Sequence, residues 1–212
     1  MTVLHVFDMD GTLLRGSTAS LQIAAALGAL DPLVALERRF ALGELDTRGF
    51  ARELRSLWTG LTPAHVTAAF AGSPWLHGIR EVCEDIRARG ERSAVVTMSP
   101  DFFARGLLDL GFDEVIASAY PPLPFAVDVD PAAILTPADK VTVVDGLLGR
   151  FEATRCVAYG DSVSDAPLFR HLSATVAVNA DTHLTGLASA SYRGDSCIAA
   201  YEIGRGLLAS AP

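Results

Sequence analysis

Two aspartates one residue apart, Asp8 and Asp10, follow directly after a short and mostly apolar run. The run, residues 3–7, predicts a buried strand. Ionised carboxylates that leave water must be paired or bound to a metal, so packing alone does not explain two of them at a buried strand end. A turn is the simpler alternative, because Asp and Gly favour turns and Gly11 follows. An EF-hand calcium loop is excluded, because Leu13 stands where that loop needs glycine.

Further polar residues lie at or beside two other predicted strands. Thr97 ends one of these strands, and Asp161 and Asp165 follow the other. Lys140, the only lysine of the chain, lies near the start of the helix that precedes the second strand. Because the carboxyl ends of parallel strands share one edge of a sheet, these side chains can converge with the aspartate pair. Taken singly, each also has an ordinary structural interpretation as a strand-end hydroxyl, a solvated lysine or a helix cap.

Together these groups suit phosphoryl transfer. One carboxylate can attack phosphorus and form an aspartyl-phosphate, and a second carboxylic acid can protonate the leaving alcohol. A hard cation such as Mg²⁺ would offset the repulsion between the attacking carboxylate and an anionic phosphate. A lysine and a hydroxyl can bind the remaining phosphoryl oxygens.

The run from Phe7 to Leu13 resembles the first motif of the haloacid dehalogenase superfamily in its phosphatase form. The other motifs of that superfamily have counterparts in the same order, with Thr97 for the second, Lys140 for the third, and Gly160-Asp161 with Asp165 for the fourth. The resemblance therefore covers nearly the whole chain. It implies a Mg²⁺-dependent phosphatase, and it implies a cap domain between the first and second motifs.

The resemblance also implies a role for each matching residue. Asp8 becomes the nucleophile and Asp10 the general acid and base, while Thr97 and Lys140 hold the phosphoryl group. The implied metal site comprises Asp8, Asp10 through its backbone carbonyl, Asp161, and Asp165 as the residue that orients the metal shell. The predicted substrate contacts are Thr97, Met98, Ser99, Lys140, Gly11, Thr12, Arg15 and Ser17. For Arg15, a solvated loop position is the simpler alternative.

The periodicity predicts an α/β fold with a Rossmann-like, doubly wound parallel sheet, because strands alternate with helices after residue 75. We predict a catalytic core of residues 1–14 and 75–212, and a small all-helical cap of residues 15–74 with its own small core. The predicted strands are residues 3–7, 92–97, 114–117, 154–159 and 175–178. The predicted helices are residues 18–28, 32–42, 48–57, 63–71, 79–89, 101–110, 138–148, 163–171, 181–187 and 197–208, with a hairpin arm at 125–129.

The cap resembles that of the phosphoserine-phosphatase-like branch. Phosphoserine itself is disfavoured, because no carboxylate lies between Thr12 and Asp31 to bind its ammonium group. Met98 and the leucines after Thr12 instead favour a neutral or partly apolar alcohol. Alternatives are a phosphoserine phosphatase, a phosphomutase or phosphotransferase with the same residues, and an inactive metabolite-binding module. A dehalogenase is disfavoured, because its chemistry needs neither the acid Asp10 nor a metal carboxylate at Asp161.

Composition limits the partners and the location. A net charge of −8 over 212 residues disfavours nucleic acid and anionic membranes as partners, and leaves a small phosphate as the predicted one. No apolar run approaches the ~18 residues of a membrane span, and no basic segment marks a secretory signal. The three cysteines share no paired spacing, which is typical of thiols in a reducing cytoplasm. The oligomeric state stays open.

Overall fold

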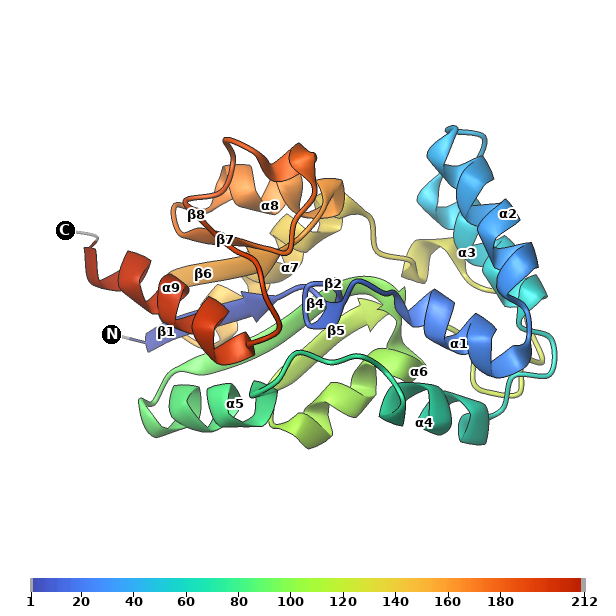
Figure 1. Ribbon diagram of the computed structural model, residues 1–212, viewed down its shortest axis with the longest axis horizontal. Coiled ribbons are helices and arrows are strands. Elements are labelled where there is room, and N and C mark those ends of the chain that lie inside the picture. The colour runs from blue at the N-terminus through green and yellow to red at the C-terminus, as the bar shows by residue number, and fades with distance from the viewer. Residues whose placement is uncertain (1, 211–212) are drawn as a thin grey trace.

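The structure is a computed structural model, and it describes residues 2–210. Its core is a six-stranded sheet in which every pair of neighbouring strands is parallel. The strand order is β5-β4-β1-β6-β7-β8 (Figure 1). The strands are β1 Thr2–Phe7, β4 Arg92–Pro100, β5 Glu114–Ser118, β6 Ala153–Gly160, β7 Thr175–Val178 and β8 Ala190–Tyr192. The predicted fold class is therefore confirmed.

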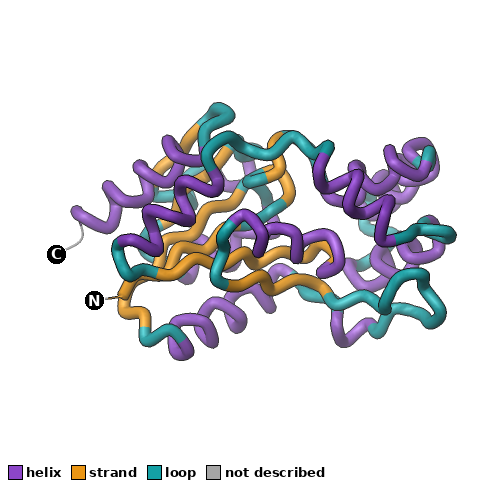
Figure 2. The backbone as a smooth tube through the Cα atoms, turned by 90° about the horizontal axis from the view of Figure 1, so that it is seen from below, coloured by secondary structure: helices purple, strands orange, loops and turns teal. Residues whose placement is uncertain are grey.

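Helices cover both faces of this sheet (Figure 2). Successive strand side chains point to opposite faces, so Leu4 and Val6 of β1 pack against helices α7 and α8, while Val3 and Phe7 face the side of α5 and α9. The helices of the core are α5 Ile79–Ala88, α6 Asp101–Ala104, α7 Pro137–Arg150, α8 Ala166–His171 and α9 Cys197–Ser210. This two-sided burial explains why the strands are almost wholly apolar.

Four further helices lie beyond the carboxyl ends of the strands, at the right of Figure 1. These cap helices are α1 Ala19–Leu27, α2 Leu30–Ala41, α3 Thr47–Leu57 and α4 Pro63–Ala71. The prediction that they have a core of their own is wrong, because all their buried apolar side chains except Ala51 belong to the cluster on one face of the sheet. Trp58, after α3, packs against Phe102 and Tyr120 with ring centroids 6.0 Å apart in both pairs. The cap helices are thus fixed to the core by aromatic packing.

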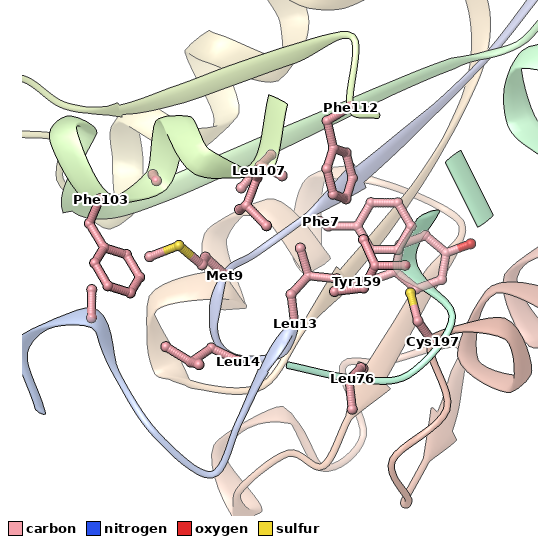
Figure 3. Packing of buried hydrophobic residues seen from close by; sticks show 14 of the residues in the cluster. Phe7, Met9, Leu13, Leu14, Leu76, Phe103, Leu107, Phe112, Tyr159 and Cys197 are labelled. Carbon is pink, nitrogen blue, oxygen red and sulfur yellow. The ribbon is translucent and has the colours of Figure 1, made fainter. Parts of the chain in front are cut away.

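The segment between β1 and α1 is anchored in the same cluster (Figure 3). Met9 and Leu13 are fully buried with Leu107, whereas Asp8 and Asp10 flank Met9 in the chain. Because neighbouring side chains of an extended chain point to opposite sides, burying Met9 turns both aspartates away from this core. Two short strands, β2 Asp10–Gly11 and β3 Leu14–Arg15, pair with each other in the same segment.

Some local predictions differ from the structure. Of the predicted helix at 101–110, only Asp101–Ala104 is α-helical and Arg105–Leu110 is a 3₁₀ helix. Residues 181–187 form only the 3₁₀ turn Thr182–Leu184, because the backbone is extended at Thr185 and left-handed at Gly186, which has φ of +78°. Residues 125–129 form no hairpin arm, since three prolines at 121, 122 and 124 remove backbone donors just before it. Strand β8 was not predicted, because its three residues are too few to show a period. Among residues 2–210, no helix combines the length and apolar content needed to cross a bilayer.

Candidate active site

The candidate site lies where the strand order reverses. The chain runs from β1 outward to β4 and β5, then returns to β6 on the other side of β1. Such a switch point leaves a crevice beyond the strand ends, where open α/β sheets bind their ligands. Asp8 directly follows β1, and its backbone N–H donates to the Tyr159 carbonyl of β6 at 2.8 Å. Asp161 directly follows β6, so the two aspartates meet across this crevice.

Lys140 is held between two of the aspartates. Its Nζ donates to Asp8 Oδ1 at 2.9 Å and to Asp165 Oδ1 at 2.7 Å, and the lysine side chain is only 1% exposed. Burial by itself lowers the pKa of Lys140, but the charges of Asp165 and Asp8 outweigh it and raise that pKa. The lysine therefore stays charged and fixes the direction of the Asp8 carboxylate.

The carboxylates outnumber the cation that pairs with them. Burial, with the charge of Asp165 next in importance, raises the pKa of Asp8 to about 7, although Lys140 acts in the opposite direction. Burial and the charges of Asp8 and Asp165 raise the pKa of Asp161 to about 8. Both shifts have the same cause, which is negative charge in a dry site without enough positive charge to balance it.

Two glycines allow the aspartates to approach so closely. A Cβ on Gly11 would lie 2.0 Å from Asp161 Oδ2, and a Cβ on Gly160 would lie 2.5 Å from Asp165 Cγ. Asp165 Oδ2 also accepts hydrogen bonds from the backbone of Asp161 at 3.0 Å and of Ser162 at 3.3 Å. Both oxygens of Asp165 are thus engaged within the protein, which suits a residue that orients its neighbours.

The donor set can hold a divalent cation. One carboxylate oxygen from each of Asp8, Asp161 and Asp165 lies within 4.8 Å of the other two. Mg²⁺ prefers oxygen ligands, and a divalent charge would offset the excess of carboxylates. Asp161 is the most available of the three, because within residues 2–210 its side chain accepts a hydrogen bond only from Thr12 Oγ1, at 3.5 Å. Thr12, predicted as a substrate contact, is buried and faces this carboxylate instead.

Asp10 has different surroundings from Asp8. Its Oδ1 accepts a hydrogen bond from the Ala19 backbone at 2.9 Å, and its Oδ2 accepts one from the Ser99 hydroxyl. Burial raises the pKa of Asp10 against the effect of these two donors. Ser99, predicted as a substrate contact, therefore has its hydroxyl on Asp10, where it fixes the orientation of that carboxyl group. A carboxyl group held this way, with its pKa raised by burial, is suited to acid and base catalysis.

A cavity of about 480 Å³ opens above these residues. Besides Asp8, Asp10, Asp161 and Lys140, its lining contains Gly11, Ser17, Thr97 and Met98 of the predicted substrate contacts. Thr97 Oγ1 accepts a hydrogen bond from the Ser99 backbone at 3.1 Å, which leaves its own proton free for donation. Arg15 does not line this cavity, and its guanidinium lies outside, 3.9 Å from Asp195. The position of Arg15 favours the solvated alternative over a substrate contact.

A second cavity of about 320 Å³ adjoins the first beneath the cap helices. The residues that line both are Asp10, Thr18, Phe40, Thr47 and Met98. Its lining includes Glu37 of α2, a residue that sequence reasoning missed. The sequence argument against an acid considered only residues 12–31, and Glu37 lies beyond them on a helix whose docking the sequence does not reveal.

A family model for haloacid dehalogenase-like hydrolases matches residues 5–170. The chain belongs to that family. The match includes Asp8, Asp10, Thr97, Lys140 and Asp161, so it covers all four motifs. No curated protein sequence matches the chain.

Several solved structures share the fold of this hydrolase. A HAD family hydrolase from Salmonella enterica subsp. enterica serovar Typhi matches with a TM-score of 0.80 and 19% identity, covering 90% of this chain and 67% of that one. A substrate-bound phosphoserine phosphatase matches with a TM-score of 0.79 and 19% identity, and the match covers 95% of this chain and 98% of that one. A probable phosphoserine phosphatase from Vibrio cholerae matches with a TM-score of 0.79 and 16% identity, and the match covers 100% of this chain and 68% of that one. At these identities the likeness establishes the fold.

Proposed function

We propose that this hydrolase is a Mg²⁺-dependent phosphatase that acts on the phosphomonoester of a small alcohol. The observation that carries the proposal is the position of Asp8, a buried carboxylate held by Lys140 beside Asp161 and open to the 480 Å³ cavity. Family membership supports a hydrolase, and the phosphoserine phosphatases among the structures of the same fold support phosphate as the group removed. The residues after the strand ends form the catalytic core, and helices α1 to α4 act as the cap.

In the first half-reaction, an Asp8 oxygen attacks phosphorus and the bond from phosphorus to the leaving oxygen breaks. Asp10 gives its proton to the departing alkoxide, which leaves as the alcohol, while Lys140 and the Thr97 hydroxyl bind phosphoryl oxygens. In the second, Asp10 accepts a proton from water, and the water oxygen attacks phosphorus, releasing inorganic phosphate and free Asp8. A Mg²⁺ held by Asp8, Asp161 and the Asp10 backbone would neutralise the charge that gathers between nucleophile and phosphate.

The test is phosphate release from p-nitrophenyl phosphate and a panel of metabolite phosphates, with Mg²⁺ and with EDTA. We expect Asp8→Asn to lose at least ~10³-fold in kcat, because an amide cannot attack phosphorus. Asp109→Asn is the matched control, since Asp109 is exposed and lies outside both cavities.

Activity of Asp8→Asn within tenfold of wild type would contradict the nucleophile assignment. Full activity in excess EDTA would contradict the metal. Transfer of phosphate to an added alcohol without release of inorganic phosphate would identify a phosphotransferase instead.

A cytoplasmic location belongs to the same proposal, because the chain's three cysteines are free thiols.

A further inference from the structure

The cavity beneath the cap helices contains one charged group apart from Asp10. Glu37 projects from α2 into it, and no described residue donates a hydrogen bond to the Glu37 carboxylate or forms an ion pair with it. Burial, and to a lesser degree the charge of Asp10, raises the pKa of Glu37. A half-buried carboxylate without a protein partner requires one from solvent or from a ligand.

Aromatic rings form much of the remaining lining. Phe40, Phe50 and Tyr120 all border the cavity, and the rings of Phe40 and Phe50 have centroids 4.8 Å apart. Ring faces attract a cation through their quadrupole, and the attraction grows when the cation leaves water. A cavity lined by a carboxylate and aromatic rings therefore has the chemistry that recognises an ammonium group.

No lysine, arginine or histidine lines this cavity, all of whose lining residues are described. In the adjoining cavity the only such residue is Lys140, which is already bound to Asp8 and Asp165. Arg55, which lies on a cap helix, contacts the Val127 carbonyl and Asp128 instead. A carboxylate on the leaving group would thus be buried without a cationic partner, which is strongly unfavourable.

We propose, on the basis of the proposed phosphatase function, that Glu37 binds an ammonium group on the leaving alcohol and that the substrate class is an amino-alcohol phosphate without a carboxylate. The two cavities share Asp10 and Met98, so the phosphate can lie at Asp8 while the alcohol extends past Asp10 toward Glu37. Glu37 is a specificity-determining residue in this arrangement, and Phe40, which borders both cavities, lies along the path between them.

The experiment compares substrates of equal size that differ in charge. Ethanolamine phosphate has an ammonium group where propyl phosphate has a methyl group. Choline phosphate has a quaternary nitrogen where 3,3-dimethylbutyl phosphate has a quaternary carbon. For wild type we expect kcat/KM to favour the charged member of each pair by at least ~10-fold, as for other charge-assisted contacts in dry sites. L-Phosphoserine should be hydrolysed at least ~10-fold less efficiently than ethanolamine phosphate, because its carboxylate has no partner.

Variants of Glu37 test whether this residue causes the preference for a charged substrate. In Glu37→Gln the preference for ethanolamine phosphate over propyl phosphate should fall to less than about threefold, because the amide carries no charge. Glu37→Asp keeps the charge on a shorter side chain and should keep part of the preference. Glu44→Gln is the matched control, since Glu44 is an exposed cap glutamate outside both cavities and its loss should leave the preference unchanged.

The outcomes separate this inference from the proposed function. Hydrolysis of p-nitrophenyl and propyl phosphates with no preference for the charged isosteres would overturn the inference and leave the phosphatase intact. A kcat/KM for L-phosphoserine equal to or above that for ethanolamine phosphate would overturn the exclusion of a carboxylate on the substrate. Failure to hydrolyse any phosphate would overturn both. If Glu37→Gln does not fold, the ratio between isosteres in wild type still decides.

Discussion

Replacing Gly11 by alanine should disable the metal site through a single collision. Gly11 has φ of +73°, and a Cβ there would lie 2.0 Å from Asp161 Oδ2 and 2.5 Å from its Cγ. Real Cβ atoms essentially never approach a non-bonded heavy atom closer than 3.0 Å, so the Asp161 carboxylate must move by about 1 Å. A shift of that size changes the position of the Asp161 carboxylate relative to Asp8 and Asp165, with which it forms the candidate metal site.

A displacement of that size exceeds what metal binding tolerates, since ligand distances hold to within ~0.2 Å. A misplacement of ~1 Å at a catalytic centre costs on the order of 10²-fold in rate. The left-handed backbone adds ~1–2 kcal/mol of strain for alanine, which lowers stability without acting on the metal. Gly43→Ala isolates that second effect, because Gly43 has φ of +74° and a Cβ there would meet nothing within 4 Å.

The assay is the hydrolysis of p-nitrophenyl phosphate as a function of Mg²⁺ concentration, with urea unfolding measured alongside. We expect Gly11→Ala to need at least ~10-fold more Mg²⁺ for half-maximal activity and to lose on the order of 10²-fold in kcat/KM at low Mg²⁺. Gly43→Ala should lose similar stability and keep the wild-type Mg²⁺ dependence. Equal Mg²⁺ dependence in the two variants would refute the placement of Asp161 in the metal site.

Other measurements address the remaining groups. Asp10→Asn should reduce the hydrolysis of alkyl phosphates by ~10²-fold or more and affect p-nitrophenyl phosphate far less, because a good leaving group needs no acid; equal losses would assign Asp10 a structural role. EDTA should inactivate the enzyme, Mg²⁺ should restore it and Ca²⁺ should inhibit, because Ca²⁺ takes more ligands at longer distances; activation by Ca²⁺ would contradict this. Burial holds the pKa of His5 below its usual 6.5 despite the Glu91 carboxylate 2.9 Å away, so the unfolded chain takes up the proton first and folding stability should fall as pH drops below about 6.5. Urea midpoints at pH 7.5 and 5.5 should therefore differ more in wild type than in His5→Gln, and an equal difference would show that His5 is not the group responsible.

The sequence by itself determined the sheet and the centre of the site. Strands β1 and β6 are mostly apolar and each is followed directly by an aspartate, so each can be recognised from its own few residues. Parallel strands place their carboxyl ends at one edge, so Asp8 and Asp161 were expected at the same edge, whereas the adjacency of β1 and β6 comes from the structure. Family membership, shown by the match over residues 5–170, agrees with the motif order that the sequence displays.

Only the tertiary structure decided what surrounds that centre. Residues from distant parts of the chain meet there. Ser99 contacts Asp10, Thr12 contacts Asp161, and Glu37 lines the second cavity. The helical period shows which side of α2 is polar, but not which polar residue of α2 lines the second cavity. That choice depends on how Trp58 and the other cap residues pack against the core across long separations in the chain, and local patterns carry no information about such packing.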